Sequence, residues 1–165
     1  MISRLASIKF VAVLGCFLAL AACSKKNTPD LNANTGPGAV AVPGSEQDFT
    51  TNVGDRVFFM EDQSSLTPEA QETLRRQGAW LQKYPRVTVQ VEGHADERGT
   101  REYNIALSAR RATAAREFLI AQGVKGSRIS SIAYGKERPA ALCDAEQCWS
   151  QNRRAVTVIT GGANQ

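Results

Sequence analysis

Apolar and polar residues alternate strictly over residues 86–92, where valine occupies every second position. Successive side chains of a β-strand point to opposite faces of its sheet, so this pattern predicts a strand with one covered face and one face in water. Further apolar runs at 56–59, 128–135 and 154–160 predict three more strands. The chain is therefore expected to build a small sheet of about four strands.

Helical signals lie between these strands. Thr67 and Pro68 form a typical helix start, because the hydroxyl can cap free amides and proline suits the first helical position, and Pro85 ends this helix. A second helix is predicted from Thr100 to Gly123, since glycine suits the C-terminal cap, and a short one at 144–151. This order predicts a two-layer α/β (α+β) domain whose helices pack on one face of the sheet.

The first 22 residues have the pattern of an export leader. Arg4 and Lys9 precede an apolar run at 10–22 that is short for a bilayer-spanning helix. The leader ends in Leu-Ala-Ala-Cys, which resembles the bacterial lipobox, so Cys23 is predicted to be diacylated and anchored in a membrane. In this pattern the non-acidic Ser24 favours the outer membrane. Cleavage beside an unmodified cysteine is the alternative.

Residues 24–45 are polar, rich in proline, glycine and asparagine, and lack an apolar period, which predicts a flexible tether. The predicted organisation is a signal peptide at 1–22, the lipidated cysteine and its tether at 23–48, and the folded domain at 49–165. The domain could therefore act at some distance from the membrane that holds it.

The charge and cysteine content of the chain limit the binding partners and metal sites that it could have. The net charge of +4 falls to +2 when the two basic residues of the leader are removed. Such a small positive charge is not typical of nucleic-acid-binding proteins. Cys143 and Cys148 share an oxidising compartment and are separated by four residues, so we expect a disulfide that closes a small loop. With one histidine and no second cysteine pair in the mature chain, no structural zinc site is expected.

Arg111 is an anomaly of the second helix, because it falls on the apolar stripe that contains Leu107 and Ala115. A guanidinium stays charged, so its burial demands an anion unless the side chain snorkels along the core edge. Asp96 and Glu97, between a strand and this helix, are candidate anions. Asp96 and Arg111 could form a salt bridge, or they could flank a gap and share a zwitterionic ligand.

Three segments carry a resemblance to a known family: "VEGHADERGTREYNIALSARRA" (91–112), "YGKERPA" (134–140) and "NRRAV" (152–156). They closely resemble the peptidoglycan-associated lipoproteins (Pal), whose folded part is an OmpA-like domain with a small mixed sheet. The lipobox and the tether agree with this family. The resemblance covers essentially the whole chain from Cys23.

The resemblance implies a ligand, the meso-diaminopimelate of the peptidoglycan stem peptide. In OmpA-like domains its side-chain ammonium is held by an aspartate that matches Asp96, and its carboxylate by an arginine that matches Arg111. Asn104, Asp62 and Arg153 match supporting residues. The resemblance implies no cofactor.

The resemblance also implies a cellular role. Such a lipoprotein links the outer membrane non-covalently to the cell wall from the periplasmic side. It belongs to the Tol-Pal system, where TolB competes with the wall for an overlapping surface, and it acts in outer-membrane constriction during cell division.

Two other interpretations remain. The first strand of the family commonly carries an aspartate where this chain has Met60, and an apolar residue where it has Glu61. Whether this chain makes the contacts that the family makes through that aspartate is therefore an open question. A protein-docking module without wall binding is therefore the main alternative. His94 and Ser108 suggest a hydrolase, but no motif brings a nucleophile and a base together, so we expect a packed histidine and no enzyme.

Overall fold

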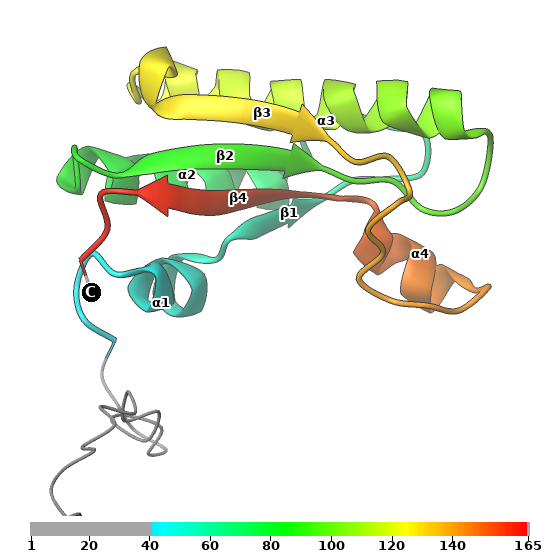
Figure 1. Ribbon diagram of the computed structural model, residues 1–165, viewed down its shortest axis with the longest axis horizontal. Helices are drawn as coiled ribbons and strands as arrows, with labels where there is room; N and C mark the ends of the chain where they lie inside the picture. Colours follow the sequence, from blue (N-terminus) through cyan, green and yellow to red (C-terminus); the bar gives the residue numbers. More distant parts are fainter. Residues whose placement is uncertain (1–40, 165) are drawn as a thin grey trace, which may run out of the picture. The chain divides into compact units, whose positions relative to one another are not determined.

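The computed structural model describes residues 41–164 (Figure 1). The predicted signal peptide, the predicted lipidation site Cys23 and most of the predicted tether lie outside these residues. Among the residues described, no helix has both the length and the apolar character needed to cross a membrane.

The predicted strands and helices all occur, within a few residues of their expected bounds. Three short helical elements are additional: α1, the π-helix η1 and the 3-10 helix η2. In chain order, the elements are α1 (Glu46–Asp48), η1 (Phe49–Val53), β1 (Arg56–Phe58), α2 (Pro68–Lys83), β2 (Thr88–Gly93), α3 (Arg101–Ala121), η2 (Gly126–Arg128), β3 (Ile129–Ala133), α4 (Glu146–Asn152) and β4 (Arg154–Gly161).

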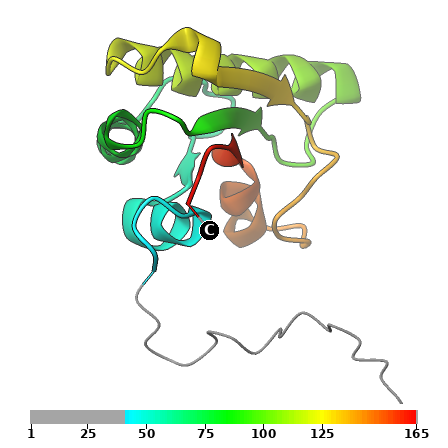
Figure 2. The same ribbon diagram turned by 60° about the vertical axis from the view of Figure 1, so that its left-hand side comes forward.

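The four strands form one mixed sheet in the order β1-β4-β2-β3. Strand β4 runs antiparallel to both neighbours, whereas β2 and β3 are parallel. Helices α2 and α3 lie behind the sheet in Figure 1, and Figure 2 shows α1 and α4 on the side away from α3. The predicted α/β fold with a small mixed sheet is confirmed. The long helices α2 and α3 share one face as predicted, whereas the predicted short helix, α4, lies on the side away from α3.

The covered face of the sheet builds the apolar core together with the inner faces of α2 and α3. Val89 and Val91 of β2 are buried, while the alternate residues Thr88 and Gln90 are half-buried, as the period-2 pattern predicts. The largest apolar side chains that are completely buried come from η1, α2 and α3: Phe49, Leu74, Leu81 and Leu119. Removing this surface from water is the main stabilising term of the fold.

Both long helices begin at their predicted caps. The Thr67 hydroxyl accepts a hydrogen bond from an amide of α2 at 3.2 Å, and Thr100 does the same for α3 at 3.2 Å. Helix α3 lies directly against β2 at Gly93, where an added Cβ would stand 1.9 Å from the carbonyl oxygen of Ser108. Only glycine allows this approach, which fixes Arg111 of α3 near the end of β2.

The predicted boundary between tether and domain, at residues 48 and 49, is wrong by several residues. Asp48 accepts hydrogen bonds from the indole of Trp80 and from the amide of Gly44, both at 2.8 Å. Ser45 caps α1, is buried, and forms a β-bridge with Asn164. Because Trp80 and Asn164 are remote in sequence, local composition does not reveal these contacts. The domain therefore includes residues from Gly44 onward.

Candidate ligand-binding site

The five residues predicted to hold a ligand gather at one end of the sheet. There β1 leads into the loop to α2, β2 leads into the loop to α3, and α4 leads into β4 (Figure 1). Asp62 lies in the first loop, Asp96 in the second, Asn104 and Arg111 on α3, and Arg153 between α4 and β4. Loops and a helix from distant parts of the sequence therefore build the site together.

Arg111 is buried to 0% exposure and is the largest side chain among the fully buried residues described. Its guanidinium donates to three backbone carbonyls. Nε donates to Gln63 at 2.9 Å, Nη1 to His94 at 2.9 Å, and Nη2 to Met60 at 3.2 Å. The side chain therefore ties the loop after β1 to the loop after β2.

The structure excludes two of the interpretations left open for Arg111, the snorkelling side chain and the salt bridge with Asp96. The guanidinium does not snorkel, and it forms no salt bridge with Asp96 or with any other carboxylate among residues 41–164. Burial lowers the pKa of Arg111 to about 10, while the charges of Asp96 and Asp62 oppose that shift. Carbonyl oxygens surround the cation in place of a carboxylate. A buried cation without an anionic partner remains.

Asp96 finds its partners in other arginines. Its Oδ2 accepts from Nη2 of Arg98 at 2.7 Å and from Nη1 of Arg153 at 3.4 Å, and its Oδ1 accepts from the Arg98 amide at 3.2 Å. Burial raises the pKa of Asp96, but the hydrogen bonds and charge of Arg98, together with Arg153, lower it below its ordinary value. Asp96 is therefore a charged carboxylate, with 10% of its side chain exposed.

Arg153 joins this carboxylate to α4. Its Nε donates to the Phe59 carbonyl at 3.2 Å, and its two terminal nitrogens donate to the two carboxylate oxygens of Glu146. The hydrogen bond with Glu146 raises the pKa of Arg153, with a smaller contribution from Asp96. Arg153, predicted as a supporting residue, is therefore an ion-paired side chain that links Asp96 to α4 and to the loop that follows β1.

Asn104 and Asp62 occupy contrasting positions. Asn104 is buried, and its Nδ2 donates to the Arg98 carbonyl at 2.7 Å, so it shapes the loop after β2. Asp62 is exposed, accepts from the Tyr103 hydroxyl at 3.2 Å, and pairs with no cation within residues 41–164. Its φ of 52° is uncommon for a residue other than glycine, and such backbone strain clusters at functional sites.

The two positions that depart from the family pattern make different contacts. Met60 binds Arg111 through its carbonyl only, and its side chain is 63% exposed. This backbone contact is therefore independent of the side chain that occupies the position. Glu61 pairs with Nη1 of Arg98 at 2.7 Å, which adds a second carboxylate to the arginine that binds Asp96.

His94 is packed inside the domain, with 2% of its side chain exposed. Its ring lies 5.6 Å from that of Tyr134. Burial, together with the positive charges of Arg154 and Arg138, lowers the pKa of His94 to about 4. Ser108 uses its hydroxyl in two hydrogen bonds to the backbone. His94 and Ser108 therefore both take part in the packing of the domain near the candidate site.

Three contributors were not anticipated from the sequence: Arg98, Glu146 and Trp149. The guanidinium of Arg98 lies 4.2 Å from the ring centroid of Trp149, whose indole donates to Glu97. Arg98 is two residues from Asp96 and lies within the segment 91–112 that carries the family resemblance, so its charge there was a usable signal. No local pattern marks the two residues of α4, because Trp149 comes from 52 residues beyond Glu97.

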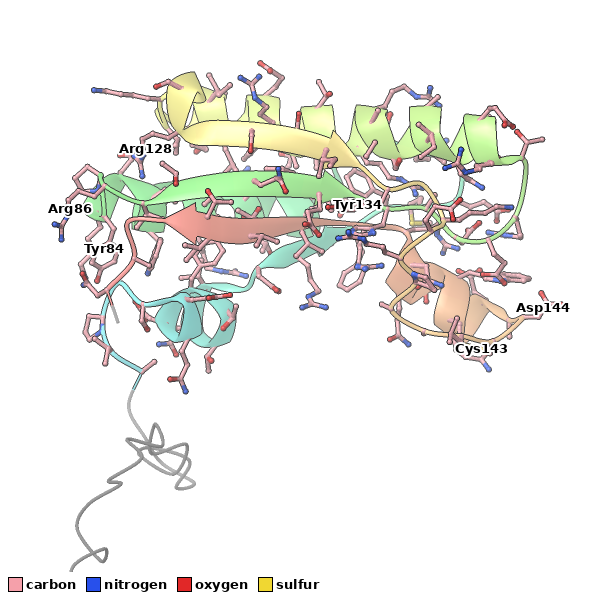
Figure 3. The ribbon with its side chains drawn as sticks, in the orientation of Figure 1. Tyr84, Arg86, Arg128, Tyr134, Cys143 and Asp144 are labelled. Carbon is pink, nitrogen blue, oxygen red and sulfur yellow. A yellow bond between two sulfur atoms is a disulfide. The ribbon has the colours of Figure 1, made fainter. Side chains whose placement is uncertain are left out.

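Cys143 and Cys148 are joined by a disulfide, which links the loop after β3 to the first turn of α4. Figure 3 shows Cys143 and Asp144 beyond the site end of the sheet. Within residues 41–164, no group of three or more histidine, cysteine or acidic side chains could hold a metal ion.

Known proteins share both the sequence and the fold. Residues 58–154 match the OmpA family. The peptidoglycan-associated lipoprotein of Rhizobium meliloti is 60% identical over 89% of this chain and 85% of its own length, and that of Agrobacterium fabrum is 56% identical over 96% and 91%. The crystal structure of the peptidoglycan-associated lipoprotein from Burkholderia pseudomallei aligns with a TM-score of 0.66 and 34% identity, over 69% of this chain and 98% of that chain. The chain therefore belongs to the OmpA family and, within it, to the peptidoglycan-associated lipoproteins.

Proposed function

We propose that the domain binds the meso-diaminopimelate of the peptidoglycan stem peptide without making or breaking a covalent bond. The ligand carboxylate would lie against Arg111, and its side-chain ammonium against Asp96. The names of the relatives associate them with peptidoglycan, which supports this polymer as the binding partner. The chemistry of the site supports a ligand that carries both charges.

The state of Arg111 carries the proposal. Three carbonyl dipoles surround its guanidinium, burial lowers the pKa of the guanidinium, and no carboxylate pairs with it among the residues described. A guanidinium has five N–H donors, so donors remain for a carboxylate even with three in use. A ligand carboxylate would supply the missing charge through charge-assisted bonds. The loop that carries Met60 and Gln63 has to move aside first, because it covers the guanidinium.

The ammonium of the ligand would meet Asp96 and Asp62. Asp96 accepts three hydrogen bonds, and a carboxylate offers about four acceptor sites, so capacity for one more donor remains. Asp62 is exposed and bonded only to Tyr103. Arg111 and these two carboxylates thus separate positive and negative charge across the site, which matches an amino-acid centre.

We further propose that lipid on Cys23 anchors the protein in the outer membrane, with the domain in the periplasm, so that it links membrane and wall. Each charge-assisted hydrogen bond contributes only about 1.5–3 kcal/mol, so a single site would be weak. A tether and a wall with many ligand copies raise the effective concentration and make weak sites sufficient. TolB, within the Tol-Pal system of envelope constriction at cell division, is the proposed protein partner.

A protein-docking module without wall binding is the second candidate. Met60 and Phe58 are 63% and 46% exposed, and both line a groove of about 560 Å³ beside Arg153. Exposed apolar side chains grouped in this way are typical of protein contacts. This candidate requires that the charged site holds no wall ligand.

Co-sedimentation of residues 41–165 with purified walls separates the two candidates. The solved Burkholderia chain is covered to 98% by this domain, so the domain is expected to fold alone. The wild type should bind diaminopimelate-type walls about tenfold or more tightly than lysine-type walls, because lysine lacks the second carboxylate that Arg111 would bind. Asp96→Asn should weaken binding to both walls, because it removes the partner of an ammonium that lysine also carries, and Gln151→Ala, on the exposed side of α4, should bind both walls like the wild type. Equal binding to both walls, or none, would reject the proposal.

A further inference from the structure

Helix α4 has few apolar contacts with the rest of the domain. It has seven residues and no side-chain cap, and only Cys148 and Asn152 are buried. None of its residues belongs to the apolar core cluster. A helix of this length is not stable by itself in water. Its position therefore depends on the specific bonds that it makes.

Two residues of α4 hold the arginines on either side of Asp96. Glu146 binds the guanidinium of Arg153 through both carboxylate oxygens. Trp149 stacks with the guanidinium of Arg98 at 4.2 Å. Arg98 and Arg153 are the two cations bonded to Asp96, at 2.7 and 3.4 Å. A displacement of α4 would therefore move both cationic partners of that carboxylate.

Each end of α4 has one strong anchor. At the C-terminal end, Oδ1 of Asn152 accepts from the amides of Ala140 and Ala141 at 2.7 and 3.1 Å, and its Nδ2 donates to the Ala141 carbonyl at 2.9 Å. At the N-terminal end, the anchor is the disulfide between Cys148 and Cys143. The first half of the helix, which carries Glu146 and Trp149, thus depends on the disulfide.

We propose that the Cys143–Cys148 disulfide is a positioning element of the ligand site. It fixes α4, so that Glu146 and Trp149 place Arg153 and Arg98 around Asp96. Opening the disulfide weakens ligand binding and leaves the core folded. The binding consequence rests on the proposed function, whereas the effect on the surroundings of Asp96 rests on the geometry alone.

The test uses residues 41–165, in which Cys143 and Cys148 are the only cysteines. Three forms are compared: the oxidised protein, the protein reduced with a phosphine, and the Cys143→Ser/Cys148→Ser variant. Gln147→Ser is the matched control, because it changes an exposed residue between the cysteines and keeps the disulfide. Titration of free thiols verifies that the bond is closed or open in each sample.

The two opened forms should bind diaminopimelate-type walls about tenfold more weakly than the oxidised protein, the equivalent of about one charge-assisted hydrogen bond. Gln147→Ser should bind like the wild type. Carboxyl NMR should show the pKa of Asp96 rising toward its ordinary value in the opened forms, because Arg98 and Arg153 are less well placed. Trp149→Phe keeps a ring beside Arg98 and should retain more binding than Trp149→Ala.

Unchanged wall affinity together with an unchanged Asp96 titration in the opened forms would overturn the proposal. Global unfolding on reduction would overturn it as well, because the disulfide would then serve the whole fold. If the oxidised protein binds no wall, the proposed function fails separately. The Asp96 titration then still decides whether the disulfide positions Arg98 and Arg153.

Discussion

Two arginines bind backbone carbonyls in the same manner at opposite ends of the sheet. Arg111 donates to three carbonyls at the end where β2 enters the loop to α3. Arg128 donates from Nε to Val87 at 2.8 Å, and from Nη2 to Leu81 and Tyr84 at 2.9 and 3.0 Å. Figure 3 shows Arg128 near Tyr84, at the end of the sheet away from α4.

The electrostatic settings of these two arginines differ. Arg128 meets carbonyls at the C-terminal end of α2, where free carbonyls and the helix dipole attract a cation. Burial lowers its pKa, and no carboxylate contributes. Arg111 is more deeply buried, and Asp96 and Asp62 act on its charge. Carbonyl binding therefore accounts fully for Arg128 as a structural residue. Arg111 pairs with no carboxylate in the part of the chain described, but the charges of two carboxylates, Asp96 and Asp62, act on it, and a structural role does not require them.

The largest expected effect comes from replacing each arginine by methionine. Arg111→Met should lower the free energy of unfolding by about 3 kcal/mol or more, because three carbonyls around a buried side chain lose their donor. Arg128→Met should cost about 1–2 kcal/mol, since water can reach the carbonyls of a half-buried site. Urea denaturation measures both. At equal folded fraction, Arg111→Met should lose wall binding and Arg128→Met should keep it.

Loss of wall binding in a folded Arg128→Met variant would contradict the assignment of Arg128 as a purely structural residue. Wild-type affinity in Arg111→Met would equally contradict the ligand-binding role of Arg111. In the second case the three carbonyl contacts would be the whole function of Arg111.

Acid should act on the Arg111 end of the sheet through His94, whose carbonyl accepts from Arg111. The pKa of His94 is lowered from 6.5 to about 4 in the folded protein, chiefly by burial. The unfolded chain therefore takes up a proton first as the pH falls. The stabilisation is complete above about pH 6.5 and is lost between there and pH 4, in total roughly 3 kcal/mol.

Urea denaturation at a series of pH values measures this loss, and His94→Gln is the comparison. The variant should lack the slope between pH 6.5 and about 5, while it keeps the loss below about pH 5 that comes from carboxylates with lowered pKa, among them Asp96 and Asp48. Identical slopes in the two proteins would show that His94 does not titrate as its burial requires.

The smallest expected effect concerns one hydroxyl at each end. Tyr103→Phe removes the hydrogen bond to Asp62 at 3.2 Å, so wall affinity should fall by about threefold or less, and stability by about 0.5 kcal/mol. Tyr84→Phe, beside Arg128, should leave wall affinity unchanged. Equal losses from both variants would mean that the tyrosine effect is not local to the site.

The parts of the fold that follow local rules could be predicted from the sequence. The caps at Thr67 and Thr100 and the alternation over residues 86–92 depend on neighbouring residues, and the structure has the elements where these signals place them. The strand order depends on pairing between distant segments and had no local signal. The tether boundary was wrong for the same reason, because Trp80 and Asn164 hold residues 44–48 on the domain.

Only some features of the candidate site could be predicted from the sequence. The position of Arg111 on an apolar stripe predicts its burial, because helical periodicity is a local property. Its partners are carbonyls of Met60, Gln63 and His94, and every residue has a carbonyl, so no sequence pattern identifies them. The bond between Asp96 and Arg153 spans 57 residues and likewise requires the folded chain.

The bridge between Ser45 and Asn164 places the start of the domain at the Arg128 end, where Gly44 approaches Tyr84. The candidate site lies at the other end. If wall and membrane pull on these two points, as the proposed function implies, the force runs along the strands. The hydrogen bonds between strands then bear the load side by side in shear and do not open one after another. Single-molecule pulling from residue 41 against the loop at Asp96 should give a higher rupture force than pulling across β1 and β3, and equal forces would refute this. The domain would thus be mechanically strongest along the line between its attachment and its ligand.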